Sequence, residues 1–334
     1  MRPGVPYSLI IQAVTATFEL MGKLENTFSW SFSAAADFDE CRRRRFWNKY
    51  GMWGGWEKNA SPETKKAYQL NKMDNRWGLM GQAAENSVMR VLRQHQAGNP
   101  ITAEEAFETV ARLFLRQKWT ESKRGEWKEN PKKFCCLREH YYGVMGDEKA
   151  VAEQMSEQIK TCITNFIEKV LPRIGNITRE QELPVKTPDM GGDPESIEFK
   201  GVKLYVIPDY AYRIGGQFHI HDWKAGKVKE SHREQLGLYA LWAREKFRAK
   251  PEDTFLYVEY LHEGLVAPFQ LAPEDFELLE ARIEDSVAEM TEYLVDFDRK
   301  RNEPLPKEEW ELAADPASCK NCNFYELCKA ELET

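Results

Sequence analysis

Apolar and polar residues alternate most regularly between Tyr205 and Gly226. An apolar run there ends in Ile207-Pro208-Asp209, and a second run, Phe218–Lys224, follows the pair Gly215-Gly216. Two such runs around a glycine pair predict a β-hairpin, because glycine readily adopts the positive φ angles of a tight turn. We therefore interpret the rest of the chain around this hairpin.

Helical and strand patterns surround the hairpin. Apolar residues at helical spacing predict helices, and short runs bounded by turn residues predict strands. A strand is expected over 176–185, a helix over 229–248, two strands over 254–271 and a long helix over 273–301. Strands flanked by helices in this order predict an α/β fold with a central mixed β-sheet.

The first half of the chain has mainly helical patterns. Ser31 or Ser33 is a suitable N-cap for a helix that includes Cys41. Another helix is expected over 77–96, and residues 101–170 are expected to be mainly helical. The predicted organisation has five segments: an N-terminal extension (1–26), N-terminal helices (27–100), a helical insertion (101–172), a core (173–302) and a Cys-rich C-terminal segment (303–334).

Length and charge limit the classes of protein. A chain of 334 residues can form one large domain with an insertion, or two domains. The net charge is −7, so any surface that binds nucleic acid must be local. No apolar run approaches the length of a membrane span. The segment Ser8–Leu20 is a poor signal peptide, because only Arg2 precedes it and it contains Glu19. A cytoplasmic protein is expected.

The hairpin carries the strongest candidate chemistry. Side chains alternate along a strand, so Asp222 and Lys224 are expected on one face and Trp223 on the other. Asp209, near the end of the partner strand, can reach the same place. Paired carboxylates bind Mg²⁺ or Mn²⁺, and a lysine beside them can orient a water molecule. The alternative is a solvated face with a cross-strand ion pair.

Two basic segments are candidate phosphate-binding surfaces. Arg42–Arg45 is either a patch that contacts phosphates or a solvated helix face beside acidic residues. The segment 112–133 is rich in Lys and Arg and contains Trp119 and Trp127. It is either a strand-guiding surface or an amphipathic helix with core aromatic residues.

The cysteines suggest a metal centre. The chain has seven, an odd number without a secretion signal, which argues against a disulfide framework. Cys319, Cys322 and Cys328 lie close together in sequence, and Cys41 lies far upstream. A tetrahedral metal site needs four ligands, so these four would join the two ends of the fold.

The order Pro208-Asp209, Asp222-x-Lys224 and Gln235-x-x-x-Tyr239 resembles the PD-(D/E)xK nuclease superfamily, specifically its RecB-like exonuclease branch. The resemblance implies a restriction-endonuclease-like core in which Asp209, Asp222 and Lys224 are catalytic.

The same resemblance implies a set of metal and DNA contacts. One or two Mg²⁺ or Mn²⁺ ions would be held by Asp209 and Asp222, with the backbone carbonyl of Trp223 as a further ligand. RecB-like nucleases have Gly-x-x-x-His on an earlier helix, whereas this chain has Gly81 followed by Glu85. Glu85 is therefore either a replacement metal ligand or an ordinary surface residue. The resemblance implies Gln235 and Tyr239 as DNA-binding residues. Because Tyr239 also fits the apolar stripe of its helix, Arg233 and Gln235 are the favoured contacts to the substrate.

The cysteine spacing resembles the iron-sulfur exonucleases related to RecB, including those of CRISPR adaptation. This implies a structural 4Fe-4S cluster held by Cys41, Cys319, Cys322 and Cys328, with zinc as the main rival. We therefore predict a metal-dependent DNA exonuclease, with DNA as substrate and possible protein partners in CRISPR adaptation or recombination. One alternative is a nucleic-acid-binding or assembly protein with a weakened nuclease site. Another is a redox sensor that binds nucleic acid.

Overall fold

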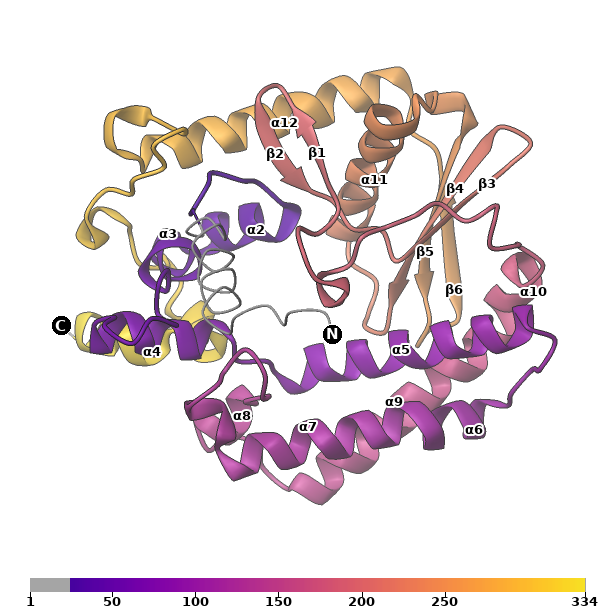
Figure 1. Ribbon diagram of the computed structural model, residues 1–334, viewed down its shortest axis with the longest axis horizontal. Helices are drawn as coiled ribbons and strands as arrows, with labels where there is room; N and C mark the ends of the chain where they lie inside the picture. Colours follow the sequence, from indigo (N-terminus) through magenta and orange to yellow (C-terminus); the bar gives the residue numbers. More distant parts are fainter. Residues whose placement is uncertain (1–24, 334) are drawn as a thin grey trace, which may run out of the picture.

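The predicted hairpin forms half of a four-stranded sheet, which lies toward the right of Figure 1. A computed structural model describes residues 25–333, so most of the predicted N-terminal extension lies outside the described residues. The strands lie in the order β3 (Tyr210–Ile214), β4 (Gln217–Lys224), β5 (Thr254–Tyr260) and β6 (Leu265–Phe269). β4 and β5 are parallel, and the other two pairs are antiparallel. The predicted α/β fold with a mixed sheet is confirmed.

The hairpin turn is at the predicted glycine pair, but its first strand begins later than expected. Gly215 and Gly216 have φ angles of 55° and 95°, so both adopt the conformation that favours glycine. Pro208 has no N–H to donate, and β3 begins only after Asp209. The preceding apolar run instead forms β2 (Val202–Tyr205), which pairs with β1 (Ser196–Phe199) in a separate two-stranded sheet.

The strand predicted over 176–185 was wrong. Only an isolated bridge forms there, between Glu182 and Tyr212 at the edge of β3. Leu183 N donates to Ala211 O in the same place, at 2.9 Å. The next residue is Pro184, which cannot donate a further ladder bond, so the pairing stops.

Helices cover both faces of the four-stranded sheet (Figure 1). On one face, α11 (Ser231–Phe247) and α12 (Pro273–Glu292) pack with α2 (Phe32–Glu40) and the two-stranded sheet around apolar side chains of β4 and β5. α11 matches the helix predicted over 229–248. α12 ends at Glu292, before the predicted limit near residue 301, and the segment after it contains Asp296 with a φ angle of 56°.

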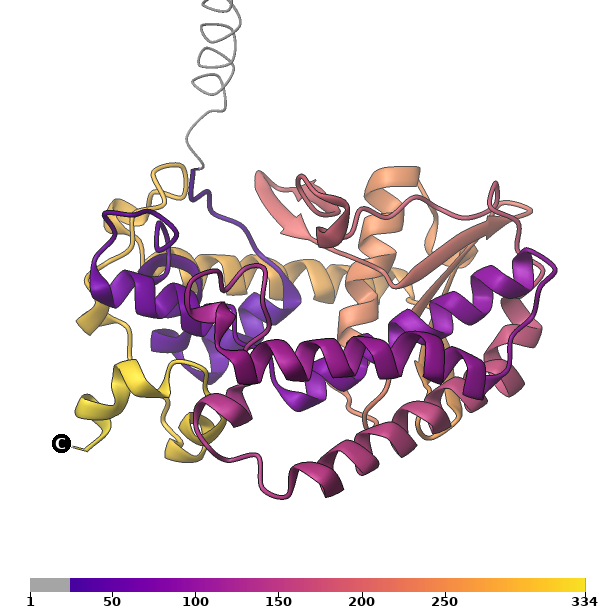
Figure 2. The same cartoon turned by 60° about the horizontal axis from the view of Figure 1, so that its bottom comes forward.

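The opposite face of the sheet packs against a helical layer (Figure 2). Its long helices are α5 (Arg76–Gln96), α7 (Arg112–Arg124) and α9 (Glu148–Asn165). The short helices α6 (Ala103–Ala106) and α10 (Leu171–Ile174) complete it. The helical character predicted for 77–96 and for most of 101–170 is therefore confirmed.

A third apolar cluster joins segments that are far apart in sequence. It contains Trp47 and Leu70 from the first third of the chain, and Phe324 and Cys328 from the last ten described residues. Four helices contribute side chains to this cluster or pack against it: α3 (Arg42–Phe46), α4 (Pro62–Asn71), α8 (Arg138–Tyr141) and α13 (Tyr325–Leu332). The N-terminal and C-terminal segments therefore pack together, at the left of Figure 1.

Candidate active site

A cavity of about 230 Å³ lies at the carboxyl end of β4. The sequence-predicted residues that line it are Asp209, Asp222, Trp223, Lys224, Gln235, Tyr239 and Glu85. They come from the segment before β3, from β4, from α11 and from α5. The fold therefore brings together side chains from positions 85 to 239 of the sequence.

Asp209 joins the start of β3 to the end of β4. Its Oδ2 accepts a hydrogen bond from the backbone N–H of Trp223 at 2.6 Å. The Trp223 ring lies on the other face of β4, where its centroid is 5.6 Å from that of Phe166. Asp222 and Lys224 share the opposite face, as the alternation of side chains predicted. Asp222 is 1 % exposed, so this is not a solvated surface pair.

Burial raises the pKa of both aspartates in the cavity. Burial raises the pKa of Asp209 well above its ordinary value, and the charges of Asp222 and Glu85 raise it further. Burial also raises the pKa of Asp222, although Lys224 and the Tyr239 hydroxyl act in the opposite direction. Crowded carboxylates at a mostly buried site are an environment that a divalent cation stabilises.

The donor chemistry therefore suits a hard metal ion. Within residues 25–333, however, no group of three or more His, Cys, Asp or Glu side chains is gathered closely enough to hold one. The assignment of Asp209, Asp222, Glu85 and the Trp223 carbonyl as ligands consequently stays a prediction.

Four side chains form a closed ring of polar contacts. Lys224 Nζ lies 2.6 Å from Asp222 Oδ2 and donates to Gln235 Oε1 at 2.9 Å. Gln235 Nε2 donates to the Tyr239 hydroxyl at 3.0 Å, and that hydroxyl donates to Asp222 Oδ1 at 3.1 Å. The ring fixes the positions of the aspartate and the lysine relative to each other. Gln235 and Tyr239 therefore hold the charged pair rather than point to solvent.

The three predicted DNA-binding residues have different environments. Tyr239 is only 3 % exposed, because it lies on the apolar face of α11. Gln235 is half-buried in the cavity wall. Arg233 is exposed on the same helix, with its guanidinium 5.0 Å from the ring centroid of Phe269, and it does not line the cavity.

Residues without reactive side chains shape the same cavity, and of these only Gly81 belongs to a motif noted in the sequence. Gly81, Ala84, Ile207 and Leu261 all line it. A Cβ atom on Gly81 would meet no atom within 4 Å, so this glycine leaves open space one helical turn before Glu85. Apolar wall residues of this kind cannot be identified from residue type alone, because the same types form ordinary core.

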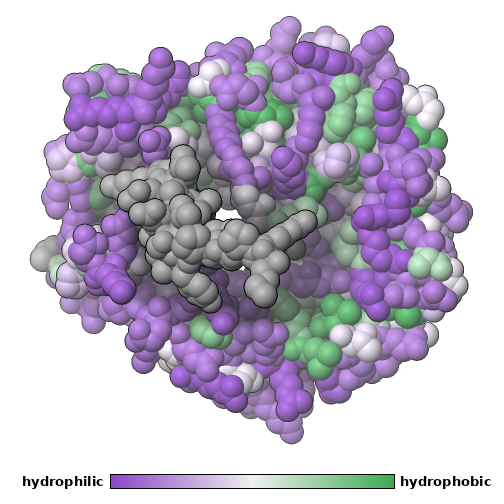
Figure 3. Space-filling model, in the orientation of Figure 1, coloured by the Kyte–Doolittle hydropathy of each residue, from purple (hydrophilic) through white to green (hydrophobic). Residues whose placement is uncertain are grey.

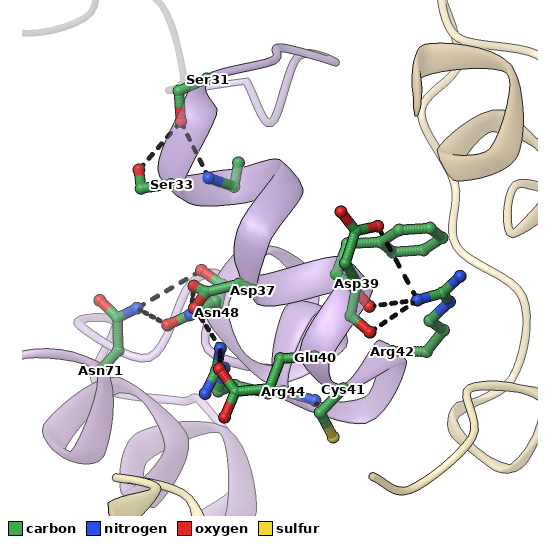
Figure 4. Close-up of polar contacts among 12 residues, drawn as sticks. Ser31, Ser33, Asp37, Asp39, Glu40, Cys41, Arg42, Arg44, Asn48 and Asn71 are labelled. Carbon is green, nitrogen blue, oxygen red and sulfur yellow. Dashed lines mark hydrogen bonds and ion pairs between the residues drawn. The ribbon is translucent and has the colours of Figure 1, made fainter. Parts of the chain in front are cut away.

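Cys41 interrupts the helix that the sequence predicts (Figure 4). Its backbone is extended, with φ −162° and ψ 111°, so α2 ends before it and α3 begins after it. Its sulfur caps α3 by accepting a hydrogen bond from Arg44 N at 3.3 Å. One predicted helix is thus two helices with the thiol at their junction.

The three C-terminal cysteines lie in the neighbourhood of Cys41. Burial raises the pKa of the Cys319 and Cys328 thiols and raises that of Cys322 to about 12. The nearby Cys41 thiol adds to each of these rises. The fold therefore places each of the three C-terminal cysteines within electrostatic range of Cys41, although the four are not gathered at metal-ligand distance.

The arginine run 42–45 has partners within the protein. Arg42 donates to Phe38 O, and Arg44 forms ion pairs with Asp37 and Glu40 (Figure 4). The Arg43 side chain is buried and binds Trp310 O and the Glu331 carboxylate. Arg45 Nη2 donates a hydrogen bond to Ser29 O at 3.5 Å. Arg42 and Arg44 therefore pair with the neighbouring acidic residues, as the second interpretation expected, whereas Arg43 is buried rather than solvated.

The aromatic residues in the second basic segment are also engaged internally. Trp127 is 6 % exposed and belongs to the third apolar cluster. Trp119 packs against the helical layer and donates to Glu148 Oε2 at 3.3 Å. These contacts fit an amphipathic helix with core aromatic residues.

The fold and the site together define a class of protein. A mixed sheet between helical layers, with aspartates and a lysine at the end of a central strand, is a restriction-endonuclease-like arrangement. A family model described as the PD-(D/E)XK nuclease superfamily matches residues 29–329. The chain belongs to this superfamily, which supports a nuclease-type activity on nucleic acid. A search of curated proteins found no match. Among the described helices, none is long and apolar enough to cross a membrane.

Proposed function

We propose that the protein is a metal-dependent DNA exonuclease of the RecB-like branch, which hydrolyses phosphodiester bonds in the cavity at the end of β4. The observation that carries the proposal is the convergence of Asp209, Asp222, Glu85 and Lys224 on that cavity.

The roles of the side chains follow from their contacts. Asp209, Asp222 and Glu85, with the Trp223 carbonyl, would hold one or two Mg²⁺ or Mn²⁺ ions, which polarise the phosphodiester and increase the acidity of a bound water. Lys224 is oriented by Asp222 and Gln235, so its ammonium group can position the attacking water and offset charge that develops on phosphate oxygens. Arg233, exposed on α11, would contact the substrate backbone.

The test is cleavage of DNA labelled at one end, single-stranded and duplex, with Mg²⁺ or Mn²⁺. We expect the wild type to degrade DNA and Lys224→Ala to lose at least 100-fold in rate, in the range seen when one charged transition-state contact is removed. Lys149→Ala is the matched control, because its side chain is 87 % exposed and outside the cavity. Equal activity in Lys224→Ala and the control would overturn the assignment of the active site.

We also propose that Cys41, Cys319, Cys322 and Cys328 hold a structural 4Fe-4S cluster. The support is their shared neighbourhood and their position between N-terminal and C-terminal segments. Anaerobic purification should give about four irons per chain and a broad visible absorbance, both lost in Cys328→Ser. One zinc per chain without visible absorbance would instead support the rival zinc site.

A nucleic-acid-binding or assembly protein with a weakened nuclease site is the second candidate. The specific observation in its favour is Glu85, a carboxylate where RecB-like nucleases have histidine. Glu85→His should retain or increase Mn²⁺-dependent cleavage if the position holds a metal. If the wild type neither binds Mn²⁺ by calorimetry nor cleaves DNA, while it still binds DNA, the second candidate replaces the first.

A further inference from the structure

A second cavity, of about 450 Å³, lies where three distant segments of the chain meet. Its walls come from the N-terminus of α5, from α8 and from the Cys-rich segment after residue 303. The residues important here are Arg76, Trp77, Arg138, Glu139 and Lys320. None of these residues belongs to the cavity at the end of β4.

The charges in this second cavity favour an anion. Three cationic side chains and one carboxylate line it, in a protein whose net charge is −7. Arg138 is only 8 % exposed, and its Nη2 donates to the backbone oxygen of Lys320. The Nε atoms of Arg138 and Arg76 have no hydrogen-bond partner among the described residues. Buried guanidinium groups with an unpartnered donor are costly, so a negative charge beside them in the cavity would stabilise both side chains.

Side chains, rather than the helix terminus, would hold that anion. The carboxylate of Glu139 accepts from Arg76 N, at 3.2 and 3.3 Å. Asn75 Oδ1 accepts from Trp77 N and Gly78 N, both at 3.0 Å. The first backbone N–H groups of α5 therefore already have acceptors within the protein. The guanidinium groups of Arg76 and Arg138 remain as hydrogen-bond donors for an anion.

Trp77 provides an aromatic surface beside these cations. It is 48 % exposed, and the Arg76 guanidinium lies 4.7 Å from its ring centroid. Trp77, Gly81 and Glu85 are spaced four residues apart, so they share one face of α5. Because Gly81 leaves open space, no side chain at that position blocks the path between Trp77 and the first cavity.

We propose that the second cavity is a phosphate-binding subsite for single-stranded nucleic acid, in which Trp77 stacks on a base. This inference rests on the proposed nuclease function and adds a place where the substrate strand is held. Trp77 and Glu85 are eight residues apart, about 12 Å along the helix at 1.5 Å per residue. At about 3.4 Å per stacked nucleotide, the subsite engages the strand three to four nucleotides from the reacting phosphate.

Binding is measured first, by fluorescence anisotropy with a labelled twelve-nucleotide single strand. All variants carry Lys224→Ala in addition, so that the strand is not cleaved. Trp77→Ala should weaken binding about 5- to 150-fold, the range for loss of one base-stacking contact. Trp56→Ala is the matched control, because Trp56 is 41 % exposed and lines neither cavity. Equal affinities for the two variants would overturn the stacking role of Trp77.

The phosphate contact is tested by the salt dependence of the same binding. Lys320→Gln should reduce the slope of log affinity against log salt concentration by about one. Lys329→Gln, at an exposed position of the same segment, is the control and should not reduce it. Both lysines are exposed, so folding is not at risk in either variant. An unchanged slope in Lys320→Gln would contradict the subsite.

Cleavage by otherwise wild-type protein separates this subsite from the reacting centre. Trp77→Ala should raise KM for the twelve-nucleotide strand. The factor by which kcat/KM falls should be at least fivefold larger on this strand than on thymidine 5′-p-nitrophenyl phosphate, which is too short to reach the subsite. Equal losses on the two substrates would refute the subsite. If the wild type cleaves neither substrate, the proposed function fails, whereas the anisotropy results still decide whether Trp77 and Lys320 bind a single strand.

Discussion

Tyr239→Phe removes one oxygen atom from the ring of polar contacts at the end of β4. The hydroxyl donates to Asp222 Oδ1 and accepts from Gln235 Nε2, which in turn positions Lys224. Burial and the neighbouring carboxylates raise the pKa of Tyr239 well above its ordinary value, so the hydroxyl stays protonated at neutral pH. A hydrogen bond to a charged group contributes about 1.5–3 kcal/mol, which corresponds to roughly 10- to 150-fold in rate.

We therefore expect kcat for DNA cleavage to fall by about that factor, with KM for DNA changed less than about twofold. Single-turnover and steady-state kinetics on labelled DNA measure both quantities. Tyr50→Phe is the control, because it removes a hydroxyl that donates to Asn302 Oδ1 at 2.9 Å, outside the cavity. A raised KM with an unchanged kcat would refute the reasoning and would support the direct DNA contact that the sequence predicted.

Three further predictions follow from other parts of the structure. Gly81→Leu should leave thermal stability unchanged or higher, because its Cβ meets open space in a helix, but should lower DNA cleavage at least tenfold by filling the cavity entrance. Burial lowers the pKa of His219 to about 4 from 6.5, so its contribution to stability is complete above pH 6.5 and is lost as pH falls toward 4. Between pH 7 and pH 5, the free energy of unfolding should therefore fall less in His219→Phe than in the wild type. The difference, measured by urea unfolding, should be about 1 kcal/mol after allowance for solvent screening. Arg43→Gln should lower the free energy of unfolding by about 2–4 kcal/mol, since it breaks buried contacts to the C-terminal segment, whereas the exposed Arg112→Gln should change it by less than about 0.5 kcal/mol.

The local pattern predicted the hairpin well because the information lies in neighbouring residues. Gly215-Gly216 specifies the turn, and the strict alternation through β4 places Asp222 and Lys224 on one face. The start of β3 was harder to predict. An apolar run before Pro208 has the same pattern whether it pairs with β4 or with β1, and only tertiary contacts decide between them.

The candidate site was predictable in its residues but not in its contacts. Spacing showed that Gln235 and Tyr239 share a helix face, but the sequence does not reveal which partners that face meets. The arginine run 42–45 shows the same limit. Composition indicates a charged surface, whereas the fold buries Arg43 against a segment more than 260 residues away. Pairings over such distances depend on the whole fold.

The third apolar cluster has a consequence for the order of events during synthesis. Trp47 and Phe324 pack in one cluster but are separated by most of the chain. At about 5–20 residues per second, a ribosome needs roughly 15–55 s to extend the chain from one to the other. During that interval the apolar side chains around Trp47 and Leu70 lack the partners that Phe324 and Cys328 provide. Chaperones that shield exposed apolar surface would therefore act on this segment before the nuclease fold is complete.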